Sequence, residues 1–139
     1  MSEQRIRSDN APDPVGAYPH ARRAGAFLFL SGVGPRQPGT DEIPGGPICD
    51  SAGGALDYDV VAQTEAVVAN VRTILEAAGS SLDKVVDVTV FLVNMEKDFA
   101  AMNQVWASHF ESVGAARTTI EVGALPTPIA VEFKVTALA

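Results

Sequence analysis

The sequence predicts an α+β fold in which one β-sheet carries two helices on a single face. Two segments repeat apolar residues at helical spacing, and six others are apolar, β-branched or alternating in the manner of strands. Their order along the chain is β-β-β-α-β-α-β-β. Because two helices suffice to cover only one face of a sheet, this order indicates a two-layer sandwich.

The first part of the chain predicts three short strands. A first short segment, RIRS at residues 5–8, is followed by a loop punctuated by Pro and Gly at 11–19. The apolar run AFLFLSGV at 26–33 is typical of a buried strand, with residues 18–23 as its hairpin partner and the turn at 24–26. Residues 34–57 are rich in Gly and Pro and show almost no periodicity, so they predict a long loop, and long ordered loops are often functional.

Both helices are predicted from their spacing and their end signals. Asp57 and Asp59 occupy N-cap positions, and the apolar spacing that follows predicts a helix from Asp59 to Ala78 with Gly79 as its stop. A second helical stripe is closed by Gly114. The members of this stripe are Phe99, Met102, Val105, Trp106 and Phe110.

The remaining strands are predicted at 85–93, 117–122 and 129–138, the last two being split by an LPTP turn. Residues 85–93 are apolar on both alternating faces, which suits a central strand. In the last strand Ile129, Val131, Phe133 and Val135 share one face, and Ala130, Glu132, Lys134 and Thr136 share the other. Two helices leave the second face of the sheet uncovered, and symmetric association is the commonest way to cover such a face.

Composition restricts the class of protein. The 139 residues contain 47% hydrophobic and 19% charged residues, which indicates one folded domain spanning residues 1–139. The single cysteine, Cys49, excludes an internal disulfide and a multi-cysteine metal site, and we regard it as incidental. No apolar run is long enough to cross a bilayer and the start does not resemble a signal peptide, so we expect a soluble, cytoplasmic protein that does not bind membranes.

The charge distribution favours a small anionic ligand over nucleic acid. Ten Lys and Arg stand against seventeen Asp and Glu, a net charge of −7, whereas phosphate backbones require clustered cations. Residues 1–36 nevertheless hold five arginines against three acids, while residues 37–139 hold five cations against fourteen acids. An acidic protein that keeps its arginines in one segment is a candidate for binding a small anion.

Two charged residues stand out as candidates for chemistry. Glu132 lies in the middle of a strand, with Lys134 on the same face. It belongs either to a solvated or paired strand face, or, if a neighbouring subunit covers that face, to a site where burial raises its pKa and makes it a general acid or base. Arg117 opens a strand, where its planar guanidinium suits either a bidentate carboxylate clamp or an ordinary salt bridge.

Other polar residues are weaker candidates. Tyr18, Ser31 and Asn103 lie in or beside apolar stretches, where each is either a satisfied structural residue or a hydrogen-bonding contact for a ligand. His20 and His109 have no partners at metal-ligand spacing, which argues against a metal site. Neither a GxSxG nucleophile motif nor a strand–GxGxxG–helix arrangement occurs, so we expect no dinucleotide cofactor.

Taken together, several motifs resemble the YjgF/RidA family over essentially the whole chain. They are PVGAYP, FLSG, NVRTILEAAG, VTVFLVNMEKDFAAMNQVW and ARTTIEVGALPTP followed by VEFKVTA. The resemblance implies a chorismate-mutase-like α+β sandwich with one mixed sheet. It also implies a homotrimer with three sites at the subunit interfaces.

The resemblance further implies an activity and roles for residues. The family's activity is the cofactor-free hydrolysis of enamines and imines to a ketone and ammonia, a hydrolase reaction at a C–N bond. Arg117 matches the arginine that holds the substrate carboxylate, and Glu132 matches the glutamate associated with water. Tyr18, Ser31 and Asn103 match other pocket positions. Thr119 stands where many members have Cys, which excludes thiol chemistry and leaves a hydroxyl for hydrogen bonding.

Within the family, PHARRAG, SGVGPRQPGT and EIPGG resemble the 2-aminomuconate deaminase branch, from bacterial degradation of aromatic compounds. Because 2-aminomuconate carries two carboxylates, a second cation is expected, with Arg36 as the candidate and His20, Arg22 or Arg23 as alternatives. The rival interpretations are a broad 2-iminopropanoate deaminase, an RNA-acting relative and a binding protein without turnover.

Overall fold

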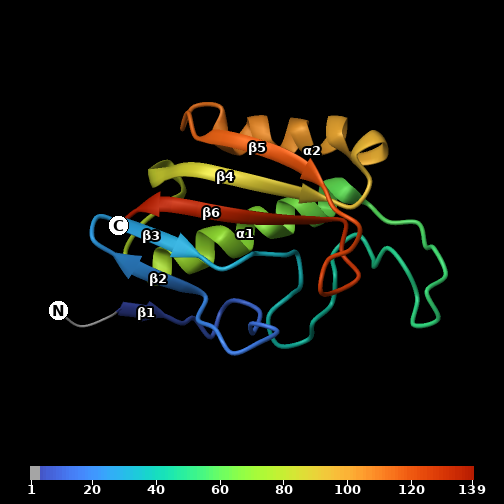
Figure 1. Ribbon diagram of the computed structural model, residues 1–139, viewed down its shortest axis with the longest axis horizontal. Coiled ribbons are helices and arrows are strands. Elements are labelled where there is room, and N and C mark those ends of the chain that lie inside the picture. Colours follow the sequence, from blue (N-terminus) through green and yellow to red (C-terminus); the bar gives the residue numbers. More distant parts are fainter. Residues whose placement is uncertain (1–3) are drawn as a thin grey trace.

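The computed structural model describes residues 4–139 as one six-stranded sheet with the strand order β1-β2-β3-β6-β4-β5. Only the β4–β5 pair is parallel, so the sheet is mixed. Figure 1 shows both helices on the same side of this sheet, which confirms the predicted architecture and element order. The elements are β1 Gln4–Ile6, β2 Ala21–Ala24, β3 Phe27–Leu30, α1 Val60–Ala77, a short 3-10 helix η1 Leu82–Lys84, β4 Val85–Leu92, α2 Met95–Phe110, β5 Ala116–Glu121 and β6 Val131–Leu138.

The helix boundaries follow from local capping. The Asp59 side chain accepts hydrogen bonds from two backbone N–H groups in the first turn of α1, and Gly79, with a φ of 79°, follows its end. Helix α2 begins one turn earlier than the stripe of apolar residues indicated, because Asn94 caps it by accepting from the N–H of Lys97. Within residues 4–139, neither helix combines the length and apolarity needed to cross a membrane.

The core lies between the helices and one face of the sheet. In β6, Val131, Phe133 and Val135 are fully buried, which confirms the predicted alternation. Ala130 departs from it: the sequence placed this residue on the face of Glu132, but it is buried as well. The reason is that β6 begins only at Val131, so Ala130 belongs to the preceding loop, where its N–H donates to the Gln63 side chain over 2.8 Å.

The opposite face of the sheet is open within one chain and exposes several large apolar side chains among polar and charged ones. Strand β3 was expected to be buried, and this is wrong for half of its residues: Leu28 and Leu30 are buried, but Phe27 and Phe29 are 40% and 44% exposed. The helices cover only one face, so the alternate residues of each strand remain uncovered. Ile120 on β5 lies on the same open face, because it pairs with Phe91.

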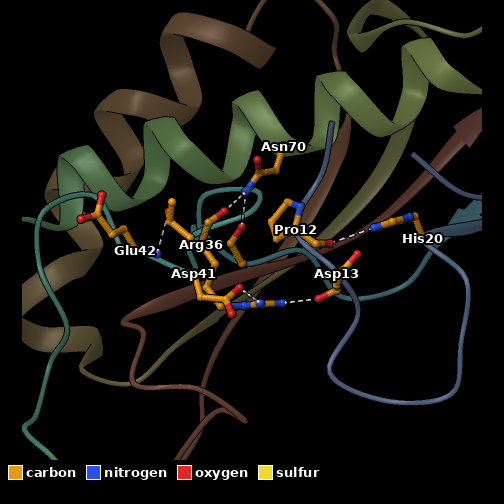
Figure 2. A network of polar contacts seen from close by, with 9 residues as sticks. Pro12, Asp13, His20, Arg36, Asp41, Glu42 and Asn70 are labelled. Carbon is orange, nitrogen blue, oxygen red and sulfur yellow. Dashed lines mark hydrogen bonds and ion pairs between the residues drawn. The ribbon is translucent and has the colours of Figure 1, made fainter. Parts of the chain in front are cut away.

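Helix α1 holds the long loop in place through amide side chains. The predicted loop at 34–57 is confirmed, and Figure 2 shows the Asn70 side chain reaching it from α1. The Asn70 amide donates to the backbone carbonyls of Gly34 and Arg36, each over 2.9 Å, and the buried Gln63 amide donates to the carbonyl of Gly46. This loop and the loops that precede β2 and β6 gather at one end of the sheet (Figure 1).

We predict that Asn70→Ala lowers the free energy of unfolding by about 2–3 kcal/mol, because two loop carbonyls lose their donor. Urea denaturation measures this loss. Thr73→Ala is the matched control: Thr73 lies one turn further along α1 and its hydroxyl bonds only to the helical carbonyl of Ala69. Equal losses in the two variants would contradict the proposed role of Asn70.

Candidate active site

A cavity of about 130 Å³ opens where the three loops gather, at the ends of β3 and β6. Four of the residues predicted from sequence line it together: Tyr18, Ser31, Arg36 and Glu132. His20, an alternative for the second carboxylate, lines it as well. The other lining residues, which the sequence did not indicate, are mainly small or apolar: Pro12, Pro14, Val15, Gly32, Val33, Gly34, Ile74, Pro126, Thr127 and Ile129.

Glu132 is the most unusual group in this cavity. Burial raises the pKa of its carboxyl, and no other described residue among 4–139 donates a hydrogen bond to it or forms an ion pair with it. A Cβ at Gly32 would lie 2.6 Å from its Oε2 atom, so a side chain at position 32 would push this carboxyl out of its present place. An ionisable group that is desolvated and uncompensated inside a cavity is typical of functional sites.

Lys134 does not compensate the Glu132 charge, although both belong to β6 and to the same face of the sheet. Its ammonium group donates instead to the carbonyl of Leu30, and burial lowers its pKa. The interpretation of Glu132 as a paired strand residue therefore finds no support among the described residues.

Ser31 and His20 have structural partners in the cavity wall. The Ser31 hydroxyl donates to the carbonyl of Pro19 over 2.8 Å. His20 is buried, its Nδ1 accepts from the N–H of Ser8, and its Nε2 lies 2.8 Å from the carbonyl of Pro12. Since Nδ1 accepts, Nε2 carries the proton and the ring is neutral. Both nitrogens of His20 are thus occupied by the fold.

Arg36 lines the cavity with both ends of its guanidinium already bonded. Figure 2 shows it between Asp41 and Asp13: Nη1 lies 2.7 Å from the Asp41 carboxylate, and Nη2 donates to the Asp13 carbonyl over 2.7 Å. Asp41 has a φ of 59°, which is uncommon for a residue with a side chain. Arg36 therefore ties the loop before β2 to the loop after β3.

The other two arginines considered for a second carboxylate lie outside the cavity. Arg23 donates to the Gln4 side chain and to the carbonyl of Ala78. Arg22 pairs with Phe29 across β2 and β3, which places it on the open face of the sheet and not among the lining residues.

Arg117, Asn103 and Thr119 are not brought to this cavity within one chain. Arg117 pairs with Val88 of β4, and Glu132 pairs with Phe91 of the same strand. Val88 and Phe91 are three residues apart on an extended strand, so their side chains, and those of their partners, point to opposite faces. The Arg117 and Glu132 side chains therefore lie on opposite faces of the sheet, separated by β4.

Arg117 lies against α2, where it meets aromatic and sulfur-containing side chains. Its Cζ is 5.0 Å from the centre of the Trp106 ring and 5.7 Å from that of Phe99, and Nη1 lies 4.0 Å from the Met102 Sδ. Burial lowers the pKa of Arg117, and no carboxylate of residues 4–139 pairs with it. The sequence assigned these three α2 residues only to a core stripe.

Thr119 shares a sheet face with Arg117, and Asn103 lies on α2 four residues after Phe99 and three before Trp106, on the helix face of those two rings. Thr119 pairs with Val90 and so shares the face of Arg117, two residues along β5. Asn103 follows Met102 on α2 and is half-buried. Residues 4–139 contain no cluster of three His, Cys, Asp or Glu side chains that could hold a metal ion.

Comparison with known proteins gives a consistent result. A family model described as "Endoribonuclease L-PSP" matches residues 8–139. A RutC family protein of Pyrococcus horikoshii is 43% identical over 129 residues, covering 93% of this chain and 92% of the relative. The crystal structure of RidA from an Antarctic Psychrobacter species has a TM-score of 0.83 at 33% identity and covers 98% and 99% of the two chains. That of E. coli TdcF with bound serine has a TM-score of 0.81 at 29% identity and covers 98% of each.

We predict that Glu132→Gln stabilises the fold increasingly as pH rises. A carboxyl whose pKa is raised by folding adds stability below its ordinary pKa, and this contribution is lost as pH rises through the raised pKa. Glutamine never ionises, so the difference in free energy of unfolding between the variant and wild type grows as pH rises above about 4, the ordinary pKa of Glu, and levels off once pH exceeds the raised pKa. Urea denaturation measures it, with Glu76→Gln on the exposed side of α1 as control. A difference that does not change with pH would refute the buried, uncompensated state of Glu132.

Proposed function

Because the chain belongs to the endoribonuclease L-PSP family, which includes the YjgF, RidA and RutC proteins, we propose that it is a hydrolytic deaminase of small enamine and imine carboxylic acids. The observation that carries this proposal is the Glu132 carboxyl, which is desolvated, has a raised pKa and faces a small cavity without a partner among the described residues. Such a carboxyl can take a proton from water and return it to a leaving nitrogen.

The complete site forms between subunits. Arg117 and Glu132 lie on opposite faces of one sheet, so one substrate can contact both only if they come from different chains. The exposed apolar residues of the open face, among them Phe27, Phe29 and Leu138, provide a surface for association. We propose a homotrimer in which Arg117, Asn103 and Thr119 of one copy approach the Glu132 cavity of the next.

The reaction needs no cofactor, since imines are intrinsically prone to hydrolysis. The enamine first tautomerises to an imine, and Arg117 binds the carboxylate beside the reacting carbon with two parallel N–H donors. The oxygen of a water bonds to that carbon while Glu132 takes one of its protons and delivers it to the imine nitrogen. The hydroxyl proton of this intermediate then passes through Glu132 to nitrogen, the C–N bond breaks, and ammonia leaves as the carbonyl forms.

The remaining predicted residues have hydrogen-bonding roles in this proposal. Tyr18 and Ser31 lie in the same cavity as Glu132, where their hydroxyl oxygens orient the water and the amino group. Asn103 and Thr119 lie beside Arg117 and hold the substrate carboxylate or its neighbouring atoms. Orientation of this kind accounts for most of the expected acceleration.

Which substrate of this class is used depends on whether Arg36 can bind a second carboxylate. A dicarboxylate such as 2-aminomuconate requires a second cation, and Arg36 lines the cavity. It binds such a substrate only by exchanging its Asp41 partner, whose side chain is 71% exposed and free to move away. The existing Arg36–Asp41 pair favours the rival substrate, 2-iminopropanoate, which has one carboxylate and leaves the pair intact.

Two other functions follow from different features. RNA cleavage is suggested by the name of the family model, but ten cations against seventeen acids give little attraction for a polyanion. Binding without turnover is the second alternative, and the serine-bound structure of E. coli TdcF shows that a small amino acid binds to one relative. Incubation with a single-stranded RNA, and ammonia release from enamines, separate these two from a deaminase.

We predict that Glu132→Gln lowers kcat for ammonia release by roughly 10²- to 10⁴-fold, because the proton relay is lost. Arg117→Lys keeps the charge but loses the bidentate geometry, so KM rises about tenfold. Both are measured with imines generated freshly from amino acids, alongside Arg72→Gln on the exposed side of α1 as control. Full activity in a Glu132→Gln or Arg117→Ala protein that still forms trimers in sedimentation would disprove these roles.

A second pair of variants distinguishes the two substrates. If Arg36 holds a second carboxylate, Arg36→Gln raises KM for 2-aminomuconate by about tenfold and leaves KM for 2-iminopropanoate unchanged. Asp41→Asn weakens the internal competitor and lowers KM for the dicarboxylate. If Arg36→Gln affects both substrates equally, Arg36 only ties the two loops together and 2-iminopropanoate is the better assignment.

A further inference from the structure

Arg117 is held by aromatic and thioether contacts, and no carboxylate of residues 4–139 pairs with it. Its guanidinium lies over Trp106 and Phe99 of α2, and its only hydrogen-bond partner of residues 4–139 is the weak thioether acceptor of Met102. An aromatic ring attracts a cation through the negative charge of its face and leaves the cation's charge unneutralised. A carboxylate partner would instead occupy the N–H groups that a ligand needs.

Of the two rings that Arg117 meets, Trp106 is the one packed against the core. Its ring stacks on Phe110 with ring centres 4.4 Å apart and 29° between the planes, and it meets Phe133 at 6.0 Å and 58°. Phe110 and Phe133 are both fully buried, so Trp106 is fixed from behind by the core. Phe99, in contrast, is 36% exposed and lies farther from the guanidinium.

We propose that Trp106 is a positioning residue for carboxylate binding: it fixes the plane of the Arg117 guanidinium so that its N–H edge is directed to the ligand. The inference rests on the proposed function, in which Arg117 binds the substrate carboxylate. An arginine that is free to rotate loses side-chain entropy when it binds a ligand, whereas one already held by a ring has lost that freedom beforehand. Trp106 thus acts on affinity through Arg117 without touching the substrate.

The chemistry that recognises the ligand is a carboxylate, because the planar fork of arginine matches two oxygens in one plane. Trp106 sets the angle of this plane and thereby the direction from which the carboxylate approaches. A ligand with an uncharged amide in place of the carboxylate gains much less from Arg117. Dependence on Trp106 is therefore expected only for the charged ligand.

The test compares Trp106→Phe and Trp106→Leu. We expect Trp106→Leu to raise KM for 2-iminopropanoate about tenfold with little change in kcat, and Trp106→Phe to retain most of the affinity because a ring face remains. Isothermal titration with pyruvate and with its uncharged amide is the second readout. The Kd for pyruvate rises about as much as KM in Trp106→Leu, while that for the amide is unaffected.

A merely structural role gives a different pattern. If Trp106→Leu only reduces the amount of folded protein, the apparent kcat and the fraction of binding sites fall while KM and Kd stay unchanged. The loss of activity in Trp106→Leu and Trp106→Phe then follows the order of their thermal midpoints. That result, or equal effects on pyruvate and its amide, overturns the inference. Pyruvate binding requires no turnover. If wild type binds pyruvate, Trp106→Leu weakens that binding and wild type releases no ammonia, only the proposed function is refuted. Wild type that neither binds pyruvate nor turns over refutes both.

Discussion

Side chains alternate between the two faces of a strand, and this constraint decides where each reacting group of the protein can lie. Strand β6 directs Phe133 into the core and therefore directs Glu132 to the open face, while the register of β5 with β4 turns Arg117 towards α2. No rotamer brings the two groups together across a packed sheet. The geometry of one chain thus separates the carboxyl of Glu132 from the guanidinium of Arg117, and the exposed apolar side chains of the open face offer a way for copies to reunite them.

Glu132 and Arg117 are both partly removed from water, and neither forms an ion pair with another residue of 4–139. Burial raises the pKa of Glu132 and lowers that of Arg117, and each shift records a cost of holding the charged form away from water. The fold tolerates the cost in two ways. Gly32 leaves space around the carboxyl, and the guanidinium lies over the faces of two α2 rings. In both cases the neighbouring groups carry no opposite charge, so the polar atoms of the charged group remain available to a ligand.

The loops that form the cavity are held together by polar side chains. Helix α1 binds the backbone of the long loop through Asn70 and Gln63, and Arg36 joins that loop to the one before β2. Each contact uses a polar side chain to satisfy a backbone carbonyl that a loop leaves without a strand or helix partner. Hydrogen bonds between segments that lie far apart in the chain therefore hold the cavity wall together.

The order of the elements, the caps at Asp59 and Gly79 and the alternation of β6 from Val131 onward were predictable, because they depend on local patterns. The motifs that mark the family grouped Tyr18, Ser31, Arg36 and Glu132 with Arg117, Asn103 and Thr119, but one chain brings only the first four to the cavity. The partners of Arg36, the exposure of Phe27 and the aromatic support of Arg117 were not predictable. They depend on contacts such as those of Arg36 with Asp13 and of Arg117 with Trp106, which no local pattern contains. The sequence by itself determined which residues carry charge and the type and order of the strands and helices. The tertiary structure alone decided which of those charges are already satisfied and which remain for a ligand, because burial and pairing are properties of residues brought together by folding.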